Sequence, residues 1–70
     1  MMPLSLLGPG EEGTILKVGG KEETKRFLNN LGFIDGTKIS VVSTVGGNVI
    51  VNIKDSRIAI NKEMANHIMV

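Results

Sequence analysis

The chain has 70 residues, of which 41% are hydrophobic, with 8 basic and 7 acidic side chains and no cysteine. This length predicts one domain over residues 1–70, near the lower size limit for independent folding, with no room for a substrate cavity beside the core. The lack of cysteine excludes disulfides and thiolate metal sites, and a formal charge of +1 without a basic cluster argues against nucleic-acid binding.

The first predicted elements are a strand and a helix separated by paired glycines. Residues 13–18 predict a strand that ends at residues 19–20 (Gly-Gly), because a β-branched run is followed by a turn signal. Residues 21–31 predict a helix, whose apolar stripe consists of Phe27, Leu28 and Leu31. Gly32 stands where a left-handed residue ends a helix, so Phe33 is expected to pack on Leu28.

The second half of the chain predicts a meander followed by a helical turn. Its expected strands are residues 37–45, 48–54, 57–60 and 67–70, and residues 46–47 (Gly-Gly) suit a tight hairpin. Alternation places these side chains toward the core: Ile39, Val41, Ser43, Val45, Val49, Val51, Ile53, Ile58 and Ile60. Asn61 is a good N-cap for one helical turn over residues 62–65 or 62–66.

This order of elements predicts a mostly β fold. Five short strands, with one helix inserted after the first strand and a helical turn before the last, are the layout of a small Src-homology-3-like barrel. Closure of the barrel removes sheet edges that would otherwise promote aggregation. The longer helix is expected to pack its apolar stripe across one barrel opening.

The ordered motifs of the chain resemble those of the FeoA family. The pieces that carry the resemblance are Leu4-Ser5-Leu6-Leu7, Gly10-Glu11, Gly19-Gly20, Lys25-Arg26-Phe27-Leu28, Leu31-Gly32-Phe33-Ile34-Asp35-Gly36-Thr37, Gly46-Gly47-Asn48-Val49, Ile58-Ala59-Ile60 and Met64-Ala65-Asn66-His67-Ile68-Met69-Val70. Two departures are Phe27 directly after Arg26, in a helix that is usually Arg-rich, and Asp35 in place of the usual proline.

The resemblance implies a Src-homology-3-like fold and a role in bacterial ferrous iron uptake. The implied partner is the cytosolic portion of FeoB, the membrane GTPase permease that carries Fe(II). The same module forms the C-terminal domain of iron-dependent repressors, so an alternative role is that of a transition-metal-binding regulatory module. We expect a cytoplasmic monomer, because no segment has the length of a membrane span or the features of a signal peptide.

The residue inventory predicts that the protein is not an enzyme. Nucleophilic catalysis needs a nucleophile, a base and an orienting group, and the chain has one histidine and no cysteine. The carboxylate pairs at residues 11–12 and 22–23 are sequential, so their side chains point apart and do not suit paired acid–base work.

A metal site has two candidate ligands, Glu63 and His67. Their spacing of four residues would place both on one face of a continued helix. A stable Fe(II) or Zn(II) site needs three or four ligands, and Glu11, Glu12 or Asp35 are the residues available to complete one. No cofactor is required by this pattern, and weak loading with Fe(II) or Zn(II) stays open.

A partner-binding surface is the best supported kind of site. The predicted contact region consists of Lys25, Arg26, Leu31, Gly32 and Phe33. Apolar residues beyond the expected core form a candidate exposed patch, namely Leu6, Leu7, Ile34, Val42 and Ile50. A sheet edge near the terminal strand is a further candidate, because an edge can accept a strand from a partner.

Overall fold

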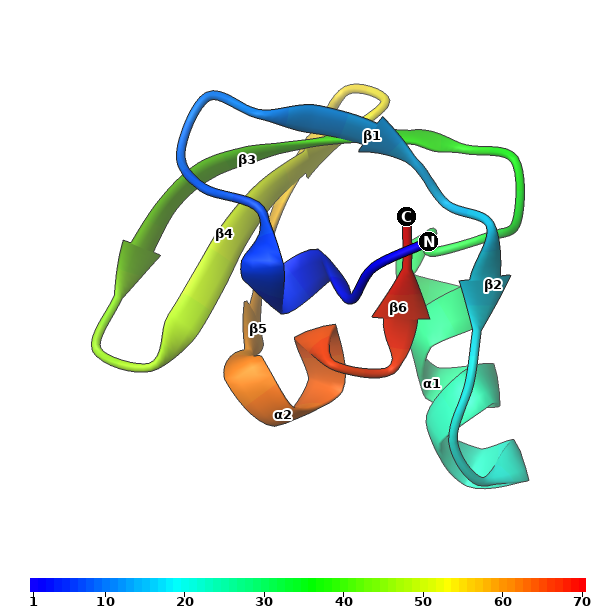
Figure 1. Cartoon of the computed structure of the whole chain (residues 1–70). Coiled ribbons are helices and arrows are strands. Elements are labelled where there is room, and N and C mark those ends of the chain that lie inside the picture. The colour runs from blue at the N-terminus through cyan, green and yellow to red at the C-terminus, as the bar shows by residue number, and fades with distance from the viewer.

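The computed structural model describes all residues from Met1 to Val70 and contains six strands in two antiparallel sheets (Figure 1). The elements in chain order are η1 (Leu4–Leu6), β1 (Glu12–Thr14), β2 (Lys17–Val18), α1 (Glu22–Leu31), β3 (Lys38–Val45), β4 (Asn48–Ile53), β5 (Ser56–Asn61), α2 (Lys62–Ala65) and β6 (Ile68–Met69). One sheet has the order β1-β3-β4-β5, and the other pairs β2 with β6. The structure has six strands rather than the predicted five, because the predicted strand over residues 13–18 is divided into β1 and β2, and the sheet is not closed. None of the helices has the length and apolar character needed to cross a lipid bilayer.

The predicted strand over residues 13–18 is divided because the chain changes sheets in the middle of it. The Ile15 amide donates to the carbonyl of Thr37 at 2.9 Å, next to β3, whereas the Leu16 amide donates to the carbonyl of Met69 in β6 at 2.8 Å. Ile15 is fully buried at this corner. The amides of two consecutive residues thus bond to two different sheets. The segment therefore connects the sheets as a strand of a barrel would.

Helix α1 ends as its sequence predicts. Gly32 has φ of 109°, in the left-handed region, and its amide donates to the Asn29 carbonyl. The Phe33 amide donates to the Leu28 carbonyl at 3.0 Å, which completes a Schellman ending. Both Leu28 and Phe33 are fully buried, so the helix end is fixed by the core as well as by its backbone.

The meander from β3 to β5 follows the predicted alternation except at one bulge. The pairing of β3 with β4 shifts between Val41 and Ser43, which inserts one extra residue into β3. Beyond this bulge the side chains change faces, so Val45 is 59% exposed rather than in the core. The predicted inward residues of β4 are buried, as are Ile39, Val41 and Ile60 on the neighbouring strands.

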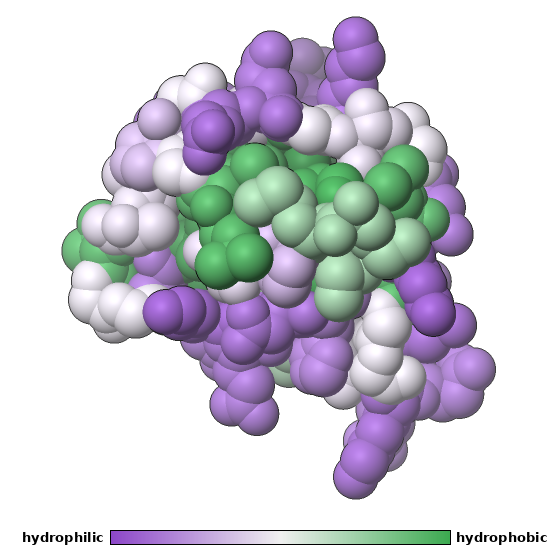
Figure 2. All heavy atoms as spheres, viewed as in Figure 1, coloured by the Kyte–Doolittle hydropathy of each residue, from purple (hydrophilic) through white to green (hydrophobic).

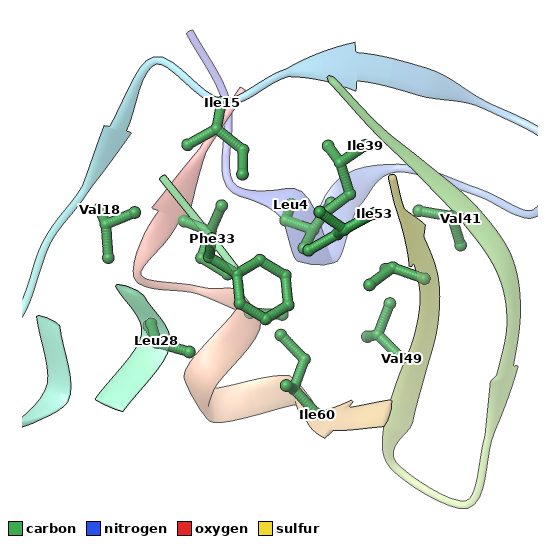
Figure 3. Packing of buried hydrophobic residues seen from close by; sticks show 13 residues of the cluster. Leu4, Ile15, Val18, Leu28, Phe33, Ile39, Val41, Val49, Ile53 and Ile60 are labelled. Atoms are coloured by element: carbon green, nitrogen blue, oxygen red, sulfur yellow. The ribbon is translucent and has the colours of Figure 1, made fainter. Parts of the chain in front are cut away.

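The core lies between the two sheets and contains 13 buried hydrophobic residues. Figure 3 shows the ring of Phe33 in the middle, surrounded by side chains from both sheets, from α1 and from η1. Leu28 is the only fully buried side chain of α1, and Phe27 is 50% exposed. The buried stripe of the helix is therefore narrower than predicted, since Leu31 packs against the core while only partly buried and Phe27 does not belong to the core.

The two ends of the chain lie side by side (Figure 1). Met2 and Val70 exchange two backbone hydrogen bonds of 2.9 and 2.8 Å, and Pro3 forms a bridge with Met69. Since β2 pairs with the other side of Met69, β6 is flanked on both sides. The terminal strand itself is therefore not a free edge, and an accepting edge near it stays a prediction.

Candidate interaction surface

A groove of about 470 Å³ runs between β2 and α1. Its lining residues are Lys17, Val18, Lys25, Asn29, Ile34 and Asp35. We call this surface the β2–α1 groove. It combines two ammonium groups and one carboxylate with the apolar side chain of Ile34, which is 47% exposed.

Helix periodicity explains which α1 residues reach the groove. Successive residues are about 100° apart around a helix, so Lys25 lies at one margin of the face centred on buried Leu28, and Asn29 lies one turn further along the same margin. Arg26 lies nearly opposite Leu28 and is exposed to solvent. The predicted contact pair is thus split, with Lys25 in the groove and Arg26 on the outer face of the helix.

The predicted corner of Leu31, Gly32 and Phe33 is mostly internal. Phe33 is fully buried, so its side chain lies in the core rather than on the surface that a partner would touch. Leu31 and Gly32 are partly buried. Gly32, whose backbone is in the left-handed region, reverses the direction of the chain after α1. This reversal brings Ile34 and Asp35 beside the helix, where both line the groove.

Sequence reasoning missed the contribution of Lys17 to this groove. Lys17 comes from β2, where it alternates with buried Val18 and therefore points outward. Strand alternation explains its exposure, but only the packing of β2 beside α1 places it in the same groove as Lys25. No local signal in the sequence predicts that proximity.

Exposed apolar side chains extend along one side of the molecule. Figure 2 shows an apolar band over the region where Figure 1 places η1, the two termini and β2. The strongly exposed apolar residues here are Met1, Leu6 and, directly before β2, Leu16, at 82%, 64% and 53%. Of the predicted patch, Leu6 and Ile34 are exposed, whereas Leu7, Val42 and Ile50 are partly buried.

The two candidate metal ligands do not share a helix face. Helix α2 ends at Ala65, and His67 lies in the turn before β6, where its amide donates to the Met64 carbonyl. The imidazole of His67 instead lies against Gly20, whose added Cβ would stand 3.2 Å from Nδ1. No group of three or more histidine and carboxylate side chains is placed to hold a metal ion. The continued helix that the spacing of Glu63 and His67 suggested is therefore wrong.

Comparisons with known proteins agree on family and fold. The model of the FeoA domain matches residues 2–70. A protein named Fe(2+) transport protein A from Methanocaldococcus jannaschii is 34% identical over 70 residues, covering 100% of this chain and 85% of that protein. The FeoA of Stenotrophomonas maltophilia, solved with zinc and described as an SH3 domain protein, matches with a TM-score of 0.82 and 25% identity over 99% of this chain and 88% of that chain.

A larger protein contains the same fold. A manganese-dependent transcriptional repressor matches with a TM-score of 0.90 and 17% identity, over 96% of this chain and 38% of that chain. At this identity the likeness concerns the fold alone. The predicted Src-homology-3-like fold, with six strands rather than five, is thereby confirmed.

Proposed function

The chain belongs to the FeoA family of ferrous iron transport proteins, and from this premise we propose that it is a cytoplasmic accessory protein that docks on the cytosolic GTPase portion of a FeoB-type permease and modulates Fe(II) uptake. The family match over residues 2–70 carries the proposal. In this proposal the protein acts by binding rather than by catalysis.

The β2–α1 groove is the surface that we assign to this docking. Lys17 of β2 and Lys25 of α1 supply two positive charges against the one carboxylate of Asp35, and Ile34 supplies an apolar contact. A partner segment with acidic residues around an aliphatic side chain would satisfy both features, because complementary charge guides encounter while the buried apolar contact supplies affinity. Arg26 and Leu31 lie outside the lining residues and would contribute at the margin.

The test is a titration of the isotope-labelled protein with the purified GTPase portion, followed by NMR. We expect saturable shifts at Lys25, Asn29 and Ile34, and Lys25→Glu is expected to weaken binding about tenfold. Lys62→Glu is the matched control, because it makes the same change in net charge on α2, away from the groove. An absence of binding at high micromolar concentration by the folded protein would refute the proposal, and equal weakening by both variants would refute the assignment of the groove.

The competing function is that of a metal-responsive module. It is supported by the zinc bound to the S. maltophilia protein. In this chain its candidate ligands are Glu63 and His67, which the fold does not bring into a group of three ligands. A titration with Zn(II) distinguishes the two functions.

A further inference from the structure

A second hollow, of about 440 Å³, lies on the outer face of the sheet formed by β1, β3 and β4. Its lining residues are Glu12, Gly13, Thr14, Lys38, Ile39, Ser40, Asn52 and Lys54. We call this surface the saddle. None of its residues lines the β2–α1 groove, so its chemistry is not explained by the docking proposed above.

Strand register explains why polar side chains gather there. Ile39 and Ile53 are paired across β3 and β4 and point into the core. Their neighbours Ser40 and Asn52 are also paired, and they point outward because successive residues of a strand alternate between faces. Lys38 precedes Ile39 and Lys54 follows Ile53, so both lysines lie next to the isoleucine pair on the side away from Ser40 and Asn52. By the same alternation they share the outer face.

The saddle is rich in hydrogen-bond donors. The Nε of Arg57 donates to the Oδ1 of Asn52 at 3.3 Å, so the amide oxygen of Asn52 is engaged and its NH₂ group is left to donate. The lysine ammonium groups are donors only, and the hydroxyls of Thr14 and Ser40 can also donate. Glu12 is the one carboxylate among the lining residues.

The backbone of Lys54 adopts a strained conformation. It is the one residue other than glycine with positive φ, at 55°, in the two-residue turn between Ile53 and Ser56. Glycine and asparagine are the usual residues in such hairpin turns, because a side chain with Cβ is strained there. Strained positions cluster at functional sites, so a lysine here calls for a functional explanation.

We propose that the saddle binds the carboxylate groups of an acidic segment of a partner protein, with Lys38 and Lys54 as the charged contacts. Charge complementarity favours this ligand, because two ammonium groups outnumber the single carboxylate of the lining, and the hydroxyls and the Asn52 NH₂ group can donate as well. A phosphate ligand is less favoured, because the free backbone N–H groups that many phosphate sites add to their cations are missing where β3 is paired on both sides.

The probe for this proposal is an acetylated tetraglutamate amide, titrated into the isotope-labelled protein at low ionic strength. We expect saturable NMR shifts at Ser40, Asn52 and Lys54. Lys54→Gly and Lys54→Asn are each expected to weaken binding about fivefold, the effect of one exposed charge pair. Because both replacements suit a left-handed turn, their melting temperatures should equal or exceed that of the unchanged protein.

Lys21→Ala is the control, because it removes one exposed positive charge at the start of α1. Retained affinity in this control, with reduced affinity in both Lys54 variants, would support the proposal. Equal weakening in all three variants, or shifts spread over every lysine, would overturn it. If inorganic phosphate produced the same saturable shifts and tetraglutamate produced none, the acidic segment would also be excluded as the ligand.

Discussion

The imidazole of His67 lies against Gly20, two residues before α1 begins. A Cβ on Gly20 would stand 3.2 Å from His67 Nδ1 and 3.4 Å from the Cβ of Thr24. The neighbouring Gly19 amide donates to the His67 carbonyl at 2.7 Å. The segment before β6 is therefore packed tightly onto the start of α1, and Gly20 is required there both by this approach and by its φ of 93°.

Gly20→Ala is expected to destabilise the domain more than Gly36→Ala does. The two glycines have nearly the same φ, 93° and 90°, but an added Cβ on Gly36 meets nothing within 4 Å. Both variants incur the cost of left-handed backbone, about 1–2 kcal/mol, and Gly20→Ala adds the cost of overpacking, about 1 kcal/mol. Urea denaturation gives both free energies of unfolding. Equal losses would mean that the histidine ring moves aside freely.

Replacing each of the two phenylalanines with alanine is expected to lower the free energy of unfolding by very different amounts. Phe33 is fully buried, so Phe33→Ala should cost about 3–5 kcal/mol. That is comparable to the whole stability of a domain of this size, about 4–10 kcal/mol, so this variant should be largely unfolded. Phe27 is 50% exposed, and Phe27→Ala should cost about 1 kcal/mol or less. Chemical-shift dispersion and urea denaturation measure both effects, and similar losses would contradict the assignment of Phe33 to the core.

Local features of the fold were predictable from sequence, whereas pairing between distant segments was not. The end of α1 was predictable because Gly32 and Phe33 act within a few residues of the helix. The division of residues 13–18 was not, because it depends on Thr37 and Met69, which lie far along the chain. The bulge after Val41 has no turn residue to mark it, and it changed the face of Val45.

The candidate site was predictable to a similar degree. Lys25, a predicted contact residue on the charged helix, lines the β2–α1 groove, and its contact with a partner stays a prediction. Phe33 was assigned to the contact surface because it follows the helix, but the same Schellman ending that makes it recognisable directs its ring into the core. The roles proposed for Lys17 and Lys54 depend on how the strands pack, since neither residue belongs to a local motif.

The N-cap of α2 offers a direct test of a single hydrogen bond. The Oδ1 of Asn61 accepts from the Met64 amide at 2.7 Å. Asn61→Ala should lower the free energy of unfolding by about 1 kcal/mol, whereas Asn61→Ser or Asn61→Asp should retain most of the stability, because each keeps a capping oxygen. Thermal and urea unfolding provide the measurement. A loss as large in Asn61→Asp as in Asn61→Ala would show that the residue acts through β5 rather than through the cap.

A titration with Zn(II) is expected to find only weak, non-saturating binding. A stable site needs three or four ligands, and the fold gathers no group of three. Imidazole is the strongest ligand available, so any NMR shifts should centre on His67 and disappear in His67→Ala. Glu63→Gln should leave them unchanged, because α2 ends between the two residues. Saturable binding of one ion that requires both Glu63 and His67 would contradict this expectation and favour the metal-responsive function over docking, since the protein would then assemble a site only when the metal is present.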